Sequence, residues 1–200
     1  IDTTAPEYTF IPEDYTAECS DEHPMEVATA TDNCGEVTIS VEEVTTPGAC
    51  QGDYTITRTF TATDDCGNAA PSVTQTITII DTTAPVLNIP SDYTAECSAY
   101  HQMDEATATD NCGEVVITLD EVTTPGSCAG DYTITRTFTA TDDCGNSTTE
   151  TQTITIIDTT APILTIPEDY TAECSDNHPM YDAIASVSYT HLRAHETDRY

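Results

Sequence analysis

The sequence predicts an all-β fold built from tandem β-sandwich domains. The chain repeats itself, since IDTTAP begins at Ile1, Ile80 and Ile157. Apolar and polar residues alternate in several runs of each unit, which is the pattern of strands with one buried face. Asx-Gly turns separate these runs, and no segment carries a helical period of useful length. An alternating, turn-punctuated unit repeated in tandem favours small β domains over helices or disorder.

The repeat sets the predicted domain organisation. Two complete units span residues 1–79 and 80–156, and a truncated third unit spans 157–186. A unit of this length is too long for a solenoid repeat and suits a small domain. Because the chain opens within the pattern and shows no signal peptide, we expect it to be an internal fragment of a longer protein.

The strands of a unit can be placed in chain order. Extended runs around EYTFIP and DYTAEC come first, and ATATD, EVTISVEEV, YTITRTFTATD and TQTITII follow. In YTITRTFTATD, Ile56, Arg58 and Phe60 share one face and threonines fill the other. DNCG and DDCGN are the expected joints between antiparallel strands. The pattern predicts about seven short strands per unit, which is typical of an immunoglobulin-like sandwich.

Composition excludes several partners. The chain has 36 acidic residues against 4 basic ones and a net charge of −32. Such a chain repels nucleic acids and anionic membranes, so we expect neither partner. A run of about 18 apolar residues is absent from the sequence, so we expect no membrane insertion. Nine cysteines without a CxxC pair fit an exported, oxidised protein at the cell surface or outside the cell.

The motif order carries a resemblance to a known family. DTTAP, DYTAEC, ATDNCG, TFTATDDCGN and TITI, in this order, resemble the hyalin-repeat (HYR) family of immunoglobulin-like domains. They resemble more closely the tandem repeats of giant surface adhesins from gliding bacteria. The likeness covers residues 1 to about 185. It implies a non-catalytic adhesion or stalk role, with neighbouring repeats and an unidentified surface or polysaccharide ligand as partners.

Four cysteines per unit allow three disulfide connectivities. Strand polarity places the first and third cysteine at one end of the unit and the second and fourth at the other. The predicted pairs are Cys19–Cys50, Cys34–Cys66, Cys97–Cys128 and Cys112–Cys144, and Cys174 is left unpaired. A thiolate metal site is the alternative, although cysteines spaced by 15 and 16 residues on strand ends make a poor local chelate.

The aspartates of the turns predict a calcium site. Strand polarity brings the linker into unit two beside the turns of that unit. The set is Asp81, Asp110, Asp142 and Asp143, and its counterpart in unit one is Asp2, Asp32, Asp64 and Asp65. Calcium takes six to eight oxygen ligands and would offset the repulsion and stiffen the joint. The alternative is that these are Asx turns whose carboxylates cap local backbone amides.

The remaining polar residues have structural interpretations. The parity of Arg58 and Arg136 predicts a stem packed on the sandwich and a guanidinium paired with a carboxylate near an edge, and the alternative is a ligand-binding arginine. His23, His101 and His178 recur at one loop position, which favours a loop role over catalysis. Since no cluster joins nucleophile, base and orienter, we predict no catalytic residue and no enzyme.

We therefore expect adhesive, disulfide-stapled repeats of a large bacterial surface protein, in which calcium stiffens a stalk and repetition gives multivalency. The alternative is a non-catalytic accessory module of a secreted enzyme, such as one that degrades polysaccharides.

Residues 187–200, VSYTHLRAHETDRY, depart from the repeat. In unit three AIAS stands where ATAT does, and a turn resembling DNCG should follow. The segment instead resembles the translation of a transposase adapter used in short-read sequencing libraries. We expect this tail to be artefactual and give it no functional weight.

Overall fold

A computed structural model describes residues 1–171, 173–174 and 181–186 of the chain. These residues form fourteen β-strands and contain no helix, which confirms the all-β prediction. The described part of the chain accordingly offers no helix that could cross a membrane. The segment interpreted as adapter sequence, 187–200, and His178 lie outside the described residues.

The first repeat forms a sandwich of a four-stranded and a two-stranded sheet. Its strands are β1 (Glu7–Phe10), β2 (Tyr15–Glu18), β3 (Thr29–Thr31), β4 (Val37–Pro47), β5 (Tyr54–Asp64) and β6 (Val73–Ile80). The large sheet has the order β2-β6-β5-β4, and β1 pairs with β3. The described residues of this repeat thus give six strands where the sequence predicts about seven. The chain changes sheets at the buried Pro12, between β1 and β2.

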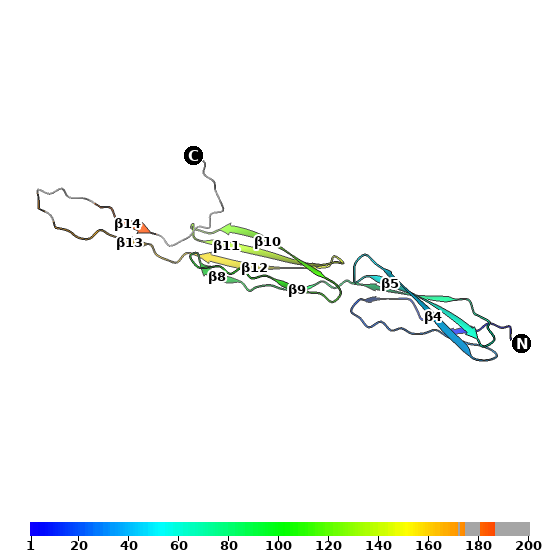
Figure 1. Ribbon diagram of the computed structural model, residues 1–200. Helices are drawn as coiled ribbons and strands as arrows, with labels where there is room; N and C mark the ends of the chain where they lie inside the picture. The colour runs from blue at the N-terminus through cyan, green and yellow to red at the C-terminus, as the bar shows by residue number, and fades with distance from the viewer. Residues whose placement is uncertain (172, 175–180, 187–200) are drawn as a thin grey trace. The chain divides into compact units, whose positions relative to one another are not determined.

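The second repeat has the same architecture. Its strands are β7 (Val86–Asn88), β8 (Tyr93–Glu96), β9 (Thr107–Thr109), β10 (Val115–Pro125), β11 (Tyr132–Asp142) and β12 (Ser147–Ile157). The sheet order is β10-β11-β12-β8, and β7 pairs with β9; Figure 1 labels all but β7 of these strands. In the third repeat, β13 (Ile163–Thr165) pairs with β14 (Ile184–Ser186), so AIAS does occupy the place of ATAT.

The compact units of the structure have different boundaries from the sequence repeats. One compact unit comprises Ile1–Asn88, Ala106–Thr118 and Thr139–Glu150, and the other includes Ile89–Glu105 and Leu119–Phe138. The first unit therefore holds the whole first repeat together with two segments of the second. These two segments carry Cys112 and Cys144. Sequence periodicity and packing thus define different boundaries.

The core follows the alternation read from the sequence. In β5, Ile56, Phe60 and Ala62 are buried, and in β6, Ile77 and Ile79 are buried. The threonines between them lie on the other face of the sheet, as the period of two requires. β4 pairs with β5 over eleven residues, from Val37 opposite Asp64 to Pro47 opposite Tyr54, but β4 is the edge strand and is mostly exposed.

A tyrosine hydroxyl joins the two sheets of the first repeat. Tyr8 lies in β1 of the small sheet, and its hydroxyl donates to the Phe60 carbonyl at 3.0 Å. The same oxygen accepts the Ala62 amide at 3.1 Å. Both of these partners belong to β5 of the large sheet. The hydroxyl thus satisfies two backbone groups inside the sandwich, which would otherwise be costly to bury.

A buried arginine makes a second connection. Arg58 is 3% exposed, and its guanidinium donates through Nε to Glu43 Oε1 at 2.8 Å. Its Nη1 donates to the Glu26 carbonyl at 2.6 Å and to Gln75 Oε1 at 3.0 Å. The guanidinium also lies 5.1 Å from the ring centre of Phe60. Because Glu43 lies on the edge strand β4, this geometry confirms the predicted structural role.

The second repeat repeats this arginine network. Arg136 bonds Glu121 at 2.9 Å, the Asp104 carbonyl at 2.9 Å and Gln152 at 3.0 Å. It lies 4.9 Å from the ring centre of Phe138. One buried arginine per complete repeat is therefore part of the fold and is not presented to a ligand.

Replacing this arginine should destabilise the first repeat. In Arg58→Ala, Gln75 Oε1 and the Glu26 carbonyl lose their buried donor, so we expect the free energy of unfolding to fall by about 2–3 kcal/mol. Urea denaturation followed by circular dichroism measures this loss. Glu42→Ala, on the exposed neighbour of Glu43, is the control and should unfold like the parent chain. An unchanged midpoint for Arg58→Ala would contradict the structural role.

Candidate cation site and cross-repeat disulfides

Cys19 and Cys50 lie at the same end of the large sheet, as the strand polarity predicts. β2 runs parallel to β6, and the Cys19 amide donates to the carbonyl of Ile80 at 2.9 Å. Cys50 lies in the turn between β4 and β5, and Tyr54 at the start of β5 pairs with Ile79. Both cysteines are therefore close to the point where β6 ends.

The disulfides nevertheless join consecutive repeats. Cys19 is bonded to Cys112 with the Cα atoms 6.2 Å apart, and Cys50 is bonded to Cys144 with the Cα atoms 5.1 Å apart. The predicted pairs Cys19–Cys50 and Cys112–Cys144 are therefore wrong. The other two predicted pairs, Cys34–Cys66 and Cys97–Cys128, do not form either, because these four cysteines are free, as is Cys174.

The order of strands explains the correction. Cys19 follows β2 at one edge of the sheet, while Cys50 precedes β5 and follows β4 at the other edge. Neighbouring strands lie about 4.8 Å apart, so two to three strand spacings separate these cysteines by about 10–14 Å. A disulfide needs Cα atoms within about 7 Å. The same order places Cys97 and Cys128 on opposite edges of the second large sheet.

Both disulfides close long loops inside the first compact unit. The sequence separations are 93 and 94 residues. In the chain-entropy model, a loop of this length stabilises the folded state by about 4–5 kcal/mol. The loops interleave, so the two contributions are not independent.

Three carboxylates form a cluster between the linker and the turns of the second repeat. One oxygen each from Asp81, Asp110 and Asp142 lies within 4.8 Å of the others. Asp81 is 6% exposed and directly follows β6, while Asp110 and Asp142 start the DNCG and DDCGN turns. The structure thus brings together three of the four aspartates predicted for this site.

Two oxygens of this cluster have no partner in the described part of the chain. Asp81 Oδ1 accepts the Thr83 amide at 3.1 Å and Asp110 Oδ2 accepts the Cys112 amide at 2.8 Å. Asp81 Oδ2 and Asp110 Oδ1 are buried without a hydrogen-bond partner among the described residues. The turn and calcium interpretations are therefore compatible, because one oxygen caps a turn and the other is available.

The electrostatics of the cluster differ between its members. Burial raises the pKa of Asp81. The hydrogen bond from the Thr83 amide opposes this rise, and the negative charges of Asp110 and Asp142 add to it, so the pKa of Asp81 is raised. Burial also acts to raise the pKa of Asp142, but hydrogen bonds from Asn146, Gly145 and Cys144 outweigh it, so this pKa is lowered. A cation would relieve the repulsion at Asp81.

The first repeat carries the equivalent cluster. Oxygens of Asp2, Asp32 and Asp64 lie within 4.8 Å of one another. Asp2 Oδ1 accepts the Thr4 amide and Asp32 Oδ2 accepts the Cys34 amide, while Asp2 Oδ2 and Asp32 Oδ1 are buried without a partner in the described chain. Hydrogen bonds from Asn68, its side chain foremost, lower the pKa of Asp64.

Asp65 and Asp143 do not join these clusters. Their carboxylates lie against Gly35 and Gly113, which have φ of 120° and 146° and leave no room for a Cβ. Asp143 Oδ2 also accepts the Gln51 amide at 2.7 Å. The sequence does offer a signal for these contacts, because each DNC sequence is followed by a glycine. A glycine permits another group, here the aspartate carboxylate, to approach the backbone closely.

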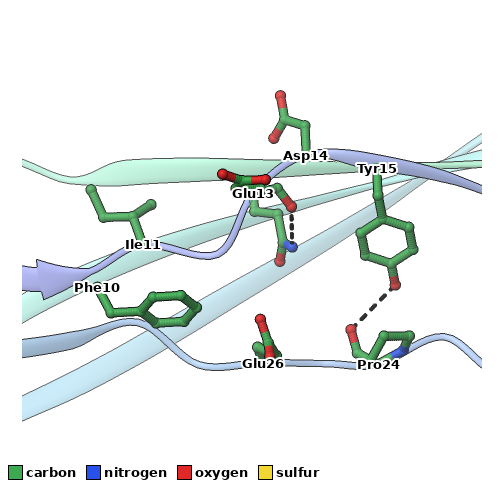
Figure 2. A pocket seen from close by; sticks show the side chains of 8 residues that line it. Phe10, Ile11, Glu13, Asp14, Tyr15, Pro24 and Glu26 are labelled. Carbon is green, nitrogen blue, oxygen red and sulfur yellow. Dashed lines mark hydrogen bonds between the residues drawn. The ribbon is translucent and has the colours of Figure 1, made fainter.

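A shallow groove of about 460 Å³ lies on the first repeat. Figure 2 shows Phe10 and Ile11 at one side and Tyr15 at the other, where its hydroxyl donates to the Pro24 carbonyl at 3.2 Å. Glu13, Asp14 and Glu26 supply carboxylates along it. Its aromatic and acidic residues can contact a sugar, but the second repeat has Asn88 and Gln102 where Phe10 and Pro24 stand.

The two histidines that the structure describes take no part in these sites. His23 and His101 lie in the loops after β2 and β8, and neither belongs to a candidate ligand cluster among the described residues. The loop role remains the prediction for both.

Comparison with known proteins places the repeats in a family. Residues 9–79 and 85–156 match the model for the "HYR-like domain with 4 cysteines". The chain belongs to this HYR-like family. Its two matched HYR-like domains fall within the repeats 1–79 and 80–156 read from the sequence, and each carries the four cysteines for which the family is described.

The HYR-like domains also have a curated relative and similar solved structures. The chain is 34% identical to hyalin of Strongylocentrotus purpuratus over 153 residues, which cover 70% of this chain and 12% of that protein. Drosophila N-cadherin EC1-4 matches at a TM-score of 0.37 and 13% identity, covering 78% of this chain and 50% of that chain. Human CDH23 EC21-23 matches at a TM-score of 0.38 and 15% identity, covering 91% of this chain and 79% of that chain. The fold assignment itself rests on the strand order and register given above.

The connectivity can be read directly from the oxidised protein. Non-reducing peptide mapping should recover Cys19 with Cys112 and Cys50 with Cys144, because only these pairs lie within bonding distance. The double variant Cys19→Ser/Cys112→Ser should lower the free energy of unfolding by about 2–5 kcal/mol. Cys174→Ser, which changes a free cysteine, is the control. Recovery of Cys19 linked to Cys50 would contradict the structure.

Proposed function

We propose that this chain is a load-bearing, adhesive segment of a large extracellular protein at the cell surface. The observation that carries the proposal is the pair of disulfides joining consecutive repeats. They add two covalent bonds between the repeats to the single one that the linker peptide provides. Disulfides of this kind persist only in an oxidising compartment, which supports export.

Family membership and the relative support the same function. The chain belongs to the HYR-like family and resembles hyalin, of which it spans 12%. The activity and partners of the whole protein are therefore part of the proposal. From the motif order we propose a giant surface adhesin of a gliding bacterium, with neighbouring repeats and a surface polysaccharide as partners and with no catalytic step.

We further propose that Ca²⁺ binds at Asp81, Asp110 and Asp142. Two partnerless buried oxygens and a third carboxylate supply hard, anionic ligands, and water can complete the coordination that calcium prefers. The cation would neutralise a site whose own charges raise the pKa of Asp81. Since Asp81 follows β6 and the other two lie in turns of the next repeat, bound calcium would stiffen the connection and make the repeats a stalk.

A second candidate is the accessory module of a secreted polysaccharide-degrading enzyme. The groove between Phe10 and Tyr15 favours it, because aromatic and carboxylate side chains are suited to sugars. Its Phe10 and Pro24 are replaced by Asn88 and Gln102 in the second domain, whereas the cysteines and acidic clusters are repeated. The repeated features favour the adhesive segment.

Calcium should stabilise the chain through the cluster. With about 2 mM Ca²⁺ and an affinity typical of extracellular modules, we expect about 1–2 kcal/mol of stabilisation and a melting temperature about 2–8 °C above that in EDTA. Differential scanning calorimetry measures the shift. Asp81→Asn should lose most of it, whereas the matched Asp143→Asn should keep it, because Asp143 lies outside the cluster. An equal shift in both variants would exclude the site.

Load bearing can be measured by pulling single molecules from their two ends. In the oxidised chain the disulfides shorten the covalent path by nearly the 93 residues between Cys19 and Cys112. Reduction should therefore increase the released contour length by on the order of 300 Å. The Cys19→Ser/Cys112→Ser/Cys50→Ser/Cys144→Ser variant should show the long contour in both conditions. A contour unaffected by reduction in the parent chain would contradict the load-bearing role.

A further inference from the structure

The Cys19–Cys112 disulfide lies against a carboxylate of the candidate cation site. An oxygen of Asp81 lies within 4.8 Å of both sulfur atoms of this bridge. An oxygen of the same carboxylate also lies within 4.8 Å of oxygens of Asp110 and Asp142. All of these residues belong to the first compact unit. Asp81 is 6% exposed, and its Oδ2 has no hydrogen-bond partner among the described residues. The bridge and the proposed cation therefore share one buried side chain.

Each cysteine of this bridge is also hydrogen-bonded beside an aspartate of the cluster. The Cys19 amide donates to the carbonyl of Ile80, the residue before Asp81, at 2.9 Å. The Cys112 amide donates to Asp110 Oδ2 at 2.8 Å. The bridge thus joins the segment that presents Asp81 to the turn that presents Asp110. Because ligands that are already held cost less to order around a cation, the bridge favours binding.

Asp142 depends less on a bridge, because its own turn holds it. Its Oδ1 accepts the amide of Gly145 at 2.6 Å and that of Asn146 at 2.8 Å, and its Oδ2 accepts the Asn146 side chain at 3.0 Å. The Cys144 amide adds a further bond to this carboxylate. The closed turn therefore fixes Asp142 whether or not Cys144 is bridged.

The Cys50–Cys144 bridge provides a matched comparison. Its sulfur atoms lie within 4.8 Å of an oxygen of Asp53, which is not in the cluster. Asp53 accepts the Asp81 amide at 3.0 Å, so it fixes the backbone of Asp81 and not its carboxylate. The two bridges have sequence separations of 93 and 94 residues, so loss of either costs nearly the same loop entropy. A difference in calcium affinity between their variants would therefore report on the site.

The first repeat shows the same cluster beside a free cysteine. Cys34 is unbridged, yet oxygens of Asp2, Asp32 and Asp64 lie within 4.8 Å of one another. Asp2, which takes the place of Asp81, is intermediate in exposure, whereas Asp81 is buried. A bridge is therefore not needed to gather the carboxylates. What accompanies the bridge is burial of the linker carboxylate, and a cation is attracted more strongly where water screens less.

We propose that the Cys19–Cys112 disulfide and calcium binding at Asp81, Asp110 and Asp142 are coupled, so that each strengthens the other. The intact bridge raises the affinity for Ca²⁺, and bound Ca²⁺ makes the bridge harder to reduce, because coupling between two sites is reciprocal. Calcium takes oxygen ligands, so the coupling passes through the carboxylates and not through the sulfur atoms. The inference rests on the calcium binding proposed above. It makes the connection sensitive to redox conditions, since reduction weakens both of its fastenings together.

The two directions of the coupling have one magnitude. We expect the loss of the bridge to weaken calcium binding about tenfold, which lies within the usual range for coupled sites. Reduction by a dithiol such as dithiothreitol transfers two electrons and two protons to the cysteines and leaves the reductant as a cyclic disulfide. Saturating Ca²⁺ should then lower the reduction potential of Cys19–Cys112 by about 30 mV, which is a tenfold change for a two-electron couple.

The test uses the full chain in a background that isolates the site. Asp2→Asn disables the first cluster and keeps the Oδ1 that accepts the Thr4 amide. Thiol exchange is prevented at the free cysteines by Cys34→Ser, Cys66→Ser, Cys97→Ser, Cys128→Ser and Cys174→Ser. This background chain is the parent for both bridge variants, and circular dichroism checks the fold of each.

Calorimetric titration with CaCl₂ measures the first direction. Cys19→Ser/Cys112→Ser should bind Ca²⁺ about tenfold more weakly than the parent, and Cys50→Ser/Cys144→Ser should lose less than about threefold.

A second measurement leaves both bridges unmutated. The parent is equilibrated in dithiothreitol buffers with saturating CaCl₂ or with EDTA, and alkylation with peptide mapping gives the reduced fraction of each bridge. The potential of Cys19–Cys112 should fall by about 30 mV in calcium, and that of Cys50–Cys144 should fall by less.

The outcomes separate the coupling from the site. A parent chain that does not bind Ca²⁺ would remove the calcium site itself, and the coupling with it. Equal affinities in the parent and both variants, or potentials that do not respond to calcium, would overturn the coupling and leave the site in place. An equal loss of affinity in the two variants would show that the bridges act only by holding the unit together, and would refute the role of Cys19–Cys112.

Discussion

The excess of negative charge is the constraint on which the rest of the structure depends. With 36 acidic and 4 basic side chains, few carboxylates can find a cationic partner. Each complete repeat buries its single arginine, where it holds an edge-strand glutamate and two oxygens of neighbouring segments. Most of the turn aspartates described here instead accept backbone amides, and a cluster such as Asp81, Asp110 and Asp142 keeps oxygens that no amide reaches.

The local structure was predictable because alternation determines which face of a strand is buried. The parity of Ile56, Arg58 and Phe60 gave the core and the buried guanidinium, and the polarity of the strands gave the ends at which the cysteines lie. Alternation carries no information about which strand is the neighbour. The parallel pairing of β2 with β6 puts Cys19 and Cys50 on opposite edges, and the predicted pairing of cysteines failed for that reason.

The candidate cation site was predictable to the level of the turn but not of the side chain. Adjacent aspartates in DDCGN look equivalent in the sequence, yet Asp142 points to the cluster and Asp143 to Gly113 and the Gln51 amide. The difference arises from the closed turn, in which Asn146 and Gly145 hold the first carboxylate. The Asx-turn and calcium interpretations of Asp81 and Asp110 therefore concern different oxygens of the same side chains. One oxygen accepts a backbone amide, and the other has no partner among the described residues.

The interleaved disulfides also change what a protease can accomplish. A cut in the exposed linker after Asp81 would leave Cys19 and Cys50 on one fragment and Cys112 and Cys144 on the other. The two fragments would remain joined by both sulfur bridges. A single nick in this segment therefore cannot separate the two fragments, and their separation requires reduction as well as cleavage.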